Sequence, residues 1–407
     1  MTDWQPACDF AAITAADLES RGEVFACVDD LYRTTGARQG QGGMRSAFDL
    51  EWRRGGEVRR AVGKVLKEEF LAQLAHDSEA REHFERSQIV LERIRGLADP
   101  HLLPVLLSTP ILGNYLLVTP FGGETLVSLV SREKSSARDR VGWLVDAVRG
   151  LAHLHRAGIA HSDVTLQNIL VRRLEGARPH GVLFDFDLAV AIDAPGNLTY
   201  AQLYGGRIVG SPDYSVTPEL VDPVLVESPV SVGRDVYAIG TALFALFTDA
   251  SVYGDVADLP TLFERIADGV VRQGKIKVDF PAEVPNSLRA IILKCLERDP
   301  RHRYPDAALL EADLAAAHAE LAVAVAPRFR STMEYVHPAV PVKLVDILET
   351  RPDPSVTPEE IGQMQAILAR ASYVLGRSLG RVKGHSIYLS IPDPRLVATG
   401  RFVEQNT

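Results

Sequence analysis

Two short stretches near the middle of the chain carry the side chains best suited to chemistry. Asp163 is followed five residues later by Asn168, and a short apolar run comes next; Asp185 stands fourteen residues after that run. Phosphoryl transfer from ATP needs one carboxylate that orients the attacking hydroxyl and accepts its proton, and an oxygen pair that holds Mg²⁺ against the phosphates. Asp163 fits the first role, and Asn168 with Asp185 fits the second.

Such a reaction depends mainly on rigid placement, so the elements around these residues matter. The apolar runs 169–171 and 182–184 predict two short buried strands, which place the polar residues on a loop and at a strand end. Apolar residues spaced by three and four predict a helix over 141–154 and another over 84–94. A further helical run covers 307–325.

These stretches resemble the protein kinase family, in particular the eukaryotic-like serine/threonine kinases of bacteria. The tripeptide H-S-D at 161–163 with Asn168 is similar to the H-R-D-x-x-x-x-N catalytic loop, and D-F-D at 185–187 is similar to the D-F-G metal motif. The segment 210–219, ending in T-P-E, resembles the end of an activation segment. The resemblance implies that Asp163, Asn168 and Asp185 are the catalytic and metal-binding residues.

Two later landmarks of the family follow in order. The segment 235–240 is similar to the start of the long buried helix of the C-terminal lobe, and 296–303 is similar to a late helix of that lobe. The resemblance implies that Arg303 pairs with Glu219 of the T-P-E triplet. It also implies a structural role for Asp235, as acceptor for backbone N–H groups of the catalytic loop. We expect His161 to be a packed structural side chain.

The nucleotide-facing motifs lie upstream. The run G-Q-G-G-M-R at 40–45 resembles the glycine-rich loop, which implies that the backbone at Gly40, Gly42 and Gly43 approaches the phosphates. Lys64, in the strand-like run 62–66, resembles the lysine that pairs with the phosphates.

The strand-like run 115–118 resembles the strand that enters the hinge between the lobes. The resemblance implies that backbone groups of Thr119 and Phe121 meet the adenine. ATP and Mg²⁺ (or Mn²⁺) are the cofactors that it implies.

The chain departs from the family pattern at several positions. Ser162 replaces the arginine that receives the activation-loop phosphate, which indicates activity independent of that phosphorylation. Thr165 stands where serine/threonine kinases have a lysine. Arg45 replaces a loop glycine. Asp187 replaces the glycine of the metal motif, and we expect it to be solvent-exposed or a helix cap rather than a third metal contact.

A further departure concerns the helix that includes Phe84 and Leu91. The position of its family glutamate is Ser87. Either Lys64 has no partner on this helix, or Glu85 or Glu92 reaches it from another register.

The resemblance implies an α+β, bilobal protein-kinase-like fold. We predict an N-terminal extension over 1–30, an N-lobe over 31–121 with a mainly antiparallel sheet and one helix, and a mainly helical C-lobe over 122–326. Prolines punctuate the start of a small C-terminal accessory segment, 327–407, of unknown role. Within it we predict a helix over 357–379 and a strand over 386–389.

Composition narrows the remaining classes of function. Acidic residues outnumber basic ones by 53 to 44, giving a net charge of −9, which disfavours nucleic acid as a partner. The three cysteines lie far apart, so neither a zinc site nor a disulfide framework is indicated. The first twenty residues lack the pattern of a signal peptide, and the longest apolar stretch is too short for a membrane helix. We therefore expect a cytoplasmic protein with no membrane partner.

The function that these features favour is an ATP- and Mg-dependent protein kinase acting on Ser or Thr hydroxyls of a protein substrate. Two alternatives remain open. A small-molecule kinase of the aminoglycoside or choline type has H-G-D and D-F-D/E motifs that are about as close to this sequence. A pseudokinase scaffold would use the fold, or the segment 327–407, to hold a partner.

Overall fold

The computed structural model of the protein describes residues 4, 6, 12–27, 30–41, 44–132, 135–174, 176–192, 199–204, 210–248, 250–254, 256, 258–272, 275–276, 280 and 284–321. The accessory segment predicted over 327–407, including its helix and strand, lies outside these residues.

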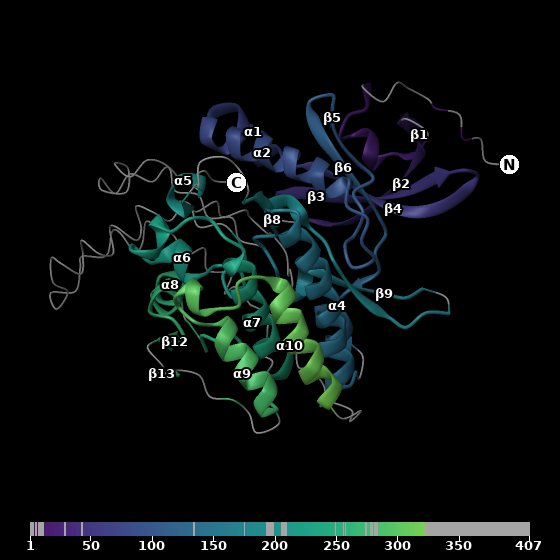
Figure 1. Ribbon diagram of the computed structural model, residues 1–407. Helices are drawn as coiled ribbons and strands as arrows, with labels where there is room; N and C mark the ends of the chain where they lie inside the picture. Colours follow the sequence, from purple (N-terminus) through teal and green to yellow (C-terminus); the bar gives the residue numbers. More distant parts are fainter. Residues whose placement is uncertain are drawn as a thin grey trace.

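The described chain forms a sheet-rich N-terminal part and a helical C-terminal part, as predicted (Figure 1). The N-terminal sheet has six antiparallel strands in the order β1-β2-β3-β4-β6-β5. Its strands are β1 Arg21–Cys27, β2 Asp30–Gln41, β3 Arg45–Arg54, β4 Glu57–Leu66, β5 Leu107–Ile111 and β6 Asn114–Pro120.

Strand β4 lies inside the sheet, and this fixes the position of Lys64. Lys64 is opposite Ala47 of β3 on one side and opposite Leu117 of β6 on the other. Side chains along β4 alternate between half-buried and buried from Ala61 to Val65. That alternation is the period of two expected for a strand with one face on the core.

The predicted boundary between an extension and the N-lobe at residue 30 does not match the structure. Strand β1 pairs antiparallel with β2, from Arg21 opposite Thr35 to Cys27 opposite Asp30. Ile13 and Leu18 are buried in the same apolar cluster as the sheet side chains Phe25 and Tyr32. The sheet therefore begins before residue 30, because these apolar side chains complete its buried face.

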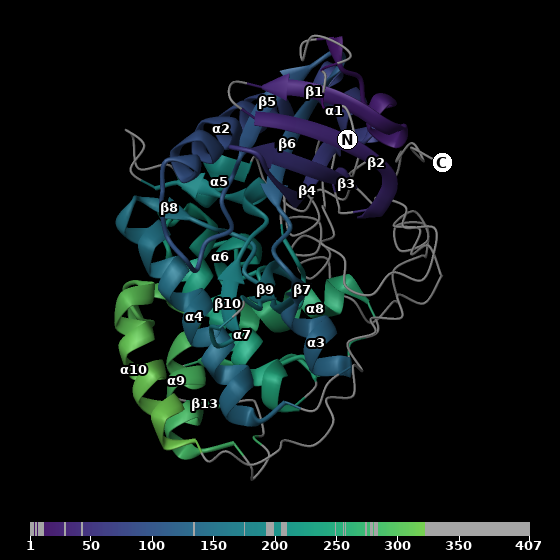
Figure 2. The same ribbon diagram turned by 90° about the vertical axis from the view of Figure 1, so that its right-hand side faces the viewer.

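The prediction of a single N-lobe helix is also wrong. Two helices, α1 Glu68–His76 and α2 Ser78–Arg95, stand between β4 and β5. Asp77 separates them, and its side chain accepts the N–H of Ala80, which caps the start of α2. Helix α2 lies where the sheet meets the helical part in both views (Figure 1, Figure 2).

The helical part is built around α4 and α10, which lie side by side (Figure 1, Figure 2). Its helices are α3 Leu126–Arg132, α4 Ala137–Arg156, α5 Tyr200–Tyr204, α6 Pro218–Val221, α7 Gly233–Thr248, α8 Leu259–Asp268, α9 Asn286–Cys295 and α10 Ala307–Glu320. Helix α4 confirms the predicted apolar face over 141–154. It begins at Ser136, whose hydroxyl and Asp139 form a capping box.

Short strands frame the loops that carry the polar motifs. β9 Ile169–Arg172 pairs with β10 His180–Leu183 and with β7 Glu124–Thr125, so the two predicted buried strands are neighbours. β8 Ile159–Ala160 pairs with β11 Val190–Ala191. A second two-stranded sheet joins β12 Val271–Arg272 and β13 Lys275–Ile276.

The apolar core of the helical part continues into the N-terminal part through α2. Val90, Leu91 and Ile94 of α2 belong to the same buried cluster as the side chains of α4 and α7. This continuity fixes α2 against the helical part, independently of any polar contact. Within the described residues, no helix combines the length and the apolar character needed to cross a membrane.

Candidate active site

The catalytic loop brings Asp163 and Asn168 together. The Asn168 amide nitrogen donates to the Asp163 carbonyl oxygen at 2.9 Å and to its carboxylate Oδ2 at 3.1 Å. Both residues are buried. The hydroxyl of Thr165 accepts the N–H groups of Gln167 and Asn168, which caps the short turn that carries the asparagine. The five-residue spacing between Asp163 and Asn168 in the sequence therefore brings the two residues into direct contact.

The other oxygen of Asp163 faces the activation segment, a contact that the sequence did not predict. Asp163 Oδ1 accepts the Ser215 hydroxyl at 2.6 Å and the Ser211 N–H at 3.0 Å. The Ser211 N–H also donates to the Ser215 hydroxyl oxygen. A hydroxyl already lies within hydrogen-bond reach of the carboxylate, which is the geometry that a general base needs toward its substrate.

Asp235, at the start of α7, anchors the catalytic loop, as predicted. Its carboxylate accepts the N–H groups of His161 and Ser162, both at 2.8 Å, and contacts the His155 ring at 3.0 Å. Burial alone would raise the pKa of Asp235, but these hydrogen bonds and the nearby histidines outweigh it and leave the pKa below its ordinary value. The carboxylate thus stays charged and holds the loop.

His161 is a packed side chain, also as predicted. It is fully buried, its Nε2 lies 3.0 Å from the Phe184 carbonyl oxygen, and its ring packs against Phe186. Ser162, next to it, has φ +68°, in the left-handed region that non-glycine residues seldom adopt. The two Asp235 hydrogen bonds at this point hold the strained backbone in place.

The metal motif meets the N-terminal sheet through an ion pair. Lys64 Nζ lies 2.8 Å from Asp185 Oδ1, and the lysine side chain also lies over the Phe184 ring. Asp185 is the second non-glycine residue in the left-handed region among the described residues, with φ +66°. Two strained residues therefore flank the same site, one in the catalytic loop and one in the metal motif.

The neighbouring charges favour the charged forms of both Lys64 and Asp185. Burial alone would lower the pKa of Lys64, but the carboxylates of Asp185 and Asp187 outweigh it and raise the pKa above its ordinary value. Burial alone would raise the pKa of Asp185, but the Lys64 ammonium outweighs it and lowers the pKa. Lys64 is therefore a fixed positive charge at the metal motif.

Asp187 is neither exposed nor a helix cap, so that expectation is wrong. Its two carboxylate oxygens lie 3.1 and 3.0 Å from Nε of Arg45, at the start of β3. The side chains are 9% and 4% exposed, respectively. The aspartate is buried because an arginine, at another position that departs from the family, supplies its counter-ion.

Among the described side chains of α2, no glutamate forms an ion pair with Lys64, which pairs with Asp185 instead. Ser87, at the family's glutamate position, is buried, and its hydroxyl donates to the Phe84 carbonyl oxygen of its own helix at 2.7 Å. Glu85 and Glu92 are exposed, and Glu92 pairs with Arg95. The sequence left two possibilities open. The structure agrees with the one in which Lys64 has no partner among the described side chains of this helix.

The predicted nucleotide-contacting residues are only partly described. Gly40 is the residue opposite Ala47 in the β2–β3 hairpin, whereas Gly42 and Gly43 lie outside the described residues. Thr119 is the residue opposite Val62, and the Phe121 N–H donates to the Arg60 carbonyl oxygen at 3.0 Å. An adenine contact at this amide would have to replace that bond.

The pair predicted between Arg303 and Glu219 forms as expected. Two parallel hydrogen bonds of 2.7 and 2.9 Å join the guanidinium to the carboxylate, and both side chains are fully buried. Arg303 also donates to the Gly233 carbonyl oxygen at the start of α7. The activation segment is thereby fixed to the start of α7, the helix that carries Asp235.

The oxygen atoms at this site suit Mg²⁺. The Asn168 amide nitrogen is bound to Asp163, so Oδ1 is the Asn168 side-chain atom that could ligate a cation, and Lys64 binds Oδ1 of the Asp185 carboxylate. Among the described residues, no three His, Cys, Asp or Glu side chains form a metal cluster by themselves. Mg²⁺ commonly binds in this way, through one or two protein oxygens that add to those of phosphates and water.

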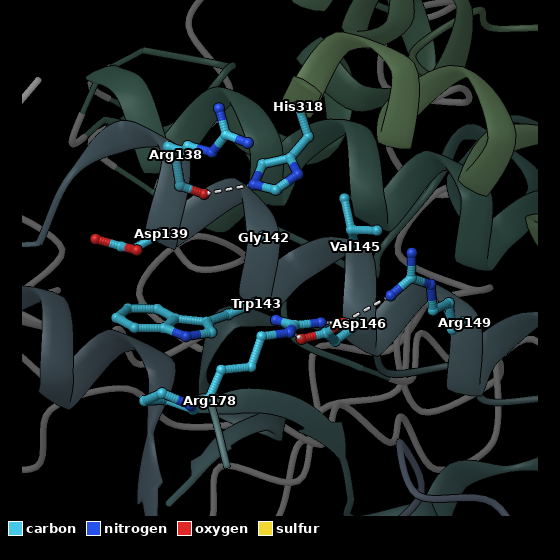
Figure 3. Close-up of a pocket in the computed structure, with 10 residues that line it drawn as sticks. Arg138, Asp139, Gly142, Trp143, Val145, Asp146, Arg149, Arg178 and His318 are labelled. Atoms are coloured by element: carbon cyan, nitrogen blue, oxygen red, sulfur yellow. Dashed lines mark hydrogen bonds and ion pairs between the residues drawn. The ribbon is translucent and has the colours of Figure 1, made fainter. Parts of the chain in front are cut away.

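A cavity of about 350 Å³ lies elsewhere, between α4, α10 and the start of β10 (Figure 3). None of the candidate catalytic or metal-binding residues lines it. Its arginines are engaged: Arg178 and Arg149 both bind the buried Asp146, and the Arg138 guanidinium donates to the Leu321 carbonyl oxygen at 3.0 Å. We assign it no part in the chemistry.

Comparison with known proteins identifies the family. A profile of the protein kinase domain matches residues 111–314. The serine/threonine-protein kinase PkaB of Streptomyces coelicolor is 28% identical over 247 residues, which cover 59% of this chain and 53% of the relative. The corresponding kinase PknL of Mycobacterium tuberculosis is 30% identical over 209 residues, 51% of this chain and 47% of the relative.

The chain belongs to the protein kinase domain family. Its similarity to PkaB and PknL confirms the resemblance to the serine/threonine kinases of bacteria. The matches span about half or less of each of these relatives' own length.

Proposed function

We propose that the protein is an ATP- and Mg-dependent serine/threonine protein kinase, which transfers the γ-phosphoryl group of ATP to hydroxyls of a protein substrate. The observation that carries the proposal is the Asn168 amide bound to Asp163, which joins a general base to a metal ligand. Lys64 and Asp185 stand opposite each other at the same site. The serine/threonine kinases among the relatives support the substrate class.

Each residue has a defined task in this proposal. Asp163 orients the substrate hydroxyl and accepts its proton as the oxygen attacks the γ-phosphorus; the bond from that phosphorus to the β-phosphate oxygen breaks, and ADP leaves. For that step the substrate hydroxyl takes the place now held by the Ser215 hydroxyl, or binds the second oxygen. Lys64 would turn from Asp185 to the phosphate oxygens, and Asp185 and Asn168 would hold Mg²⁺, which would supply positive charge to neutralise the charge that develops on the phosphates.

We further propose that activity does not depend on phosphorylation of the activation segment. At the position of the family's phosphate-binding arginine stands Ser162, which is buried and held by Asp235. A serine offers no positive charge for a phosphate. The segment is instead held by contacts that need no modification, namely Ser215 to Asp163 and Glu219 to Arg303.

The decisive experiment is transfer of radiolabelled phosphate from ATP to a generic protein substrate. We expect the wild-type protein to label the substrate, and Asp163→Asn to lower the rate about 10³-fold, a loss typical of removing a general base. Asp313→Asn makes the same chemical change on α10, where the carboxylate accepts the Tyr304 hydroxyl, and should keep the rate.

The alternatives give different results in the same experiment. Equal labelling by wild type and Asp163→Asn would mean that Asp163 is not the base. ATP consumption only with a small hydroxyl compound would identify a small-molecule kinase. Absence of ATP binding, seen as no rise in the unfolding temperature with Mg-ATP, would leave a pseudokinase scaffold.

A further inference from the structure

Two departures from the family pattern meet in space. Arg45 stands where the glycine-rich loop of the family has a glycine, and Asp187 stands where the metal motif has one. Although 142 residues apart in sequence, they form a buried ion pair in which Arg45 Nε lies 3.0 and 3.1 Å from the two carboxylate oxygens. We call this the interlobe ion pair, because it joins β3 of the sheet to the metal motif of the helical part.

The pair is placed to hold the two parts at a fixed distance. Arg45 is the first residue of β3 and is opposite Leu66 in β4, two positions from Lys64. Asp187 is the middle residue of the short turn Phe186–Leu188, directly after Asp185. A shift between the lobes would separate two charges that are shielded from water, and an unpaired buried charge is strongly unfavourable.

Arg45 also reaches α2. Its guanidinium carbon lies 6.0 Å from the centroid of the Phe84 ring, within cation–π range. Ser87, one turn along, binds only within its own helix through its side-chain hydroxyl. Arg45 thus contacts the helix and the metal motif at once, while the position of the family's helix glutamate contributes nothing toward Lys64.

We propose that the interlobe ion pair replaces the missing helix glutamate as the device that positions Lys64 and Asp185 for Mg-ATP. Arg45 and Asp187 are positioning residues in this proposal and touch neither phosphate nor metal. The effect on nucleotide rests on the function proposed above, whereas the mechanical link between the lobes does not.

Charge balance at the site leads to a specific test. Lys64, Arg45, Asp185 and Asp187 together carry no net charge. If Asp187 loses its charge, Arg45 competes with Lys64 for Asp185, and the metal ligand is occupied. If Arg45 loses its charge, Asp187 competes with Asp185 for Lys64. Loss of both charges restores the balance, so the double variant should bind Mg-ATP more tightly than either single variant.

The experiment measures equilibrium binding of a fluorescent ATP analogue with Mg²⁺ to wild type, Arg45→Gln, Asp187→Asn and the double variant. We expect each single change to weaken binding about ten-fold, and the double variant to recover to within about three-fold of wild type, because the effects of paired charges are not additive. Arg45→Lys keeps the charge and should recover part of the affinity. Losses that multiply in the double variant would overturn the proposal.

A second measurement needs no nucleotide. Hydrogen exchange should speed up at the Ala189 amide, which closes the turn that contains Asp187, when Arg45 is changed to Gln, and at 45–47 when Asp187 is changed to Asn. Arg54→Gln is the matched control, because Arg54 pairs with Asp30 inside the N-terminal sheet. Unchanged exchange in the two variants would overturn the inference. Altered exchange in a protein that transfers no phosphate would overturn the proposed function alone.

Discussion

The helical part and the nucleotide-facing part of this protein hold their polar residues in different ways. In the helical part, Arg303 binds Glu219 and Asp235 binds the catalytic loop, as the family resemblance implies. On the nucleotide side, Lys64 binds Asp185, and Arg45 binds Asp187. The first set keeps the family's contacts, and the second replaces them.

The difference indicates which contacts the fold can exchange. Arg303 and Glu219 are fully buried and tie the activation segment to α7, so their geometry depends on the packing around them. The site between the lobes needs only the right charges at the right distance. A new ion pair can therefore replace a family contact at the site between the lobes. The packed core of the helical part does not allow such a replacement.

The largest effect that we expect comes from breaking the Arg303–Glu219 pair. Arg303→Ala leaves a buried carboxylate without its counter-ion, which should lower the free energy of unfolding by about 3–5 kcal/mol. Urea unfolding measures the change. Arg301→Ala is the control, because Arg301 pairs with Asp299 at the surface, and its unfolding midpoint should not move. Equal midpoints for the two variants would contradict the assigned role of the buried pair.

An effect of intermediate size should be the pH dependence of the stability that the Lys64–Asp185 pair contributes. The folded pKa of Asp185 lies below its ordinary 3.8, so its contribution to stability is complete above pH 3.8 and is lost as the pH falls through the folded value. The folded pKa of Lys64 lies above its ordinary 10.5, so its contribution is complete below pH 10.5 and is lost at higher pH. The stability difference between wild type and Asp185→Asn should be constant from pH 5 to pH 9.

Urea unfolding at a series of pH values tests this. The difference should shrink only below pH 3.8 and above pH 10.5. A difference that already falls between pH 7 and pH 5 would show that a group outside this pair carries the dependence.

The smallest effect should come from Ser87→Ala. The Ser87 hydroxyl donates to the carbonyl oxygen of Phe84 and accepts a long hydrogen bond from the Gln88 amide, both in its own helix, and it lies at the position of the family glutamate. Its removal should change the affinity for Mg-ATP less than two-fold and the free energy of unfolding by about 1 kcal/mol or less. A ten-fold loss of affinity would show that α2 still contributes to the Lys64 site.

Much of the site could be predicted from the sequence because its residues belong to motifs with fixed spacing. Asp163 and Asn168 lie in one loop, and a five-residue separation brings them into contact. The pair of Arg303 and Glu219 could be inferred because each stands in a recognisable family segment. The two buried strands and the main helices followed from their apolar periodicity.

The rest depended on contacts between distant segments. Arg45 and Asp187 each appeared as a lost glycine, and only the folded chain brings the two opposite charges together. One feature of the sequence could have predicted this pair: Arg45 and Asp187 introduce charges of opposite sign into two motifs that face each other. The Ser215 contact with Asp163 depends on how the activation segment folds back across 52 residues. The N-terminal strand was missed because β1 is an edge strand whose buried side chains, Val24 and Phe25, are adjacent in sequence and do not alternate with polar ones.

The pairing of Lys64 with Asp185 has a consequence for how the two cofactors depend on each other. In the proposed function, ATP would draw Lys64 away and expose the charge of Asp185, which Mg²⁺ would then neutralise, so each ligand would remove an obstacle to the binding of the other. Thermodynamic reciprocity requires that Mg²⁺ raise the affinity for ATP by the same factor by which ATP raises the affinity for Mg²⁺. ATP titrations at two concentrations of free magnesium measure that factor, and when magnesium is scarce the protein will require more ATP to be half-saturated.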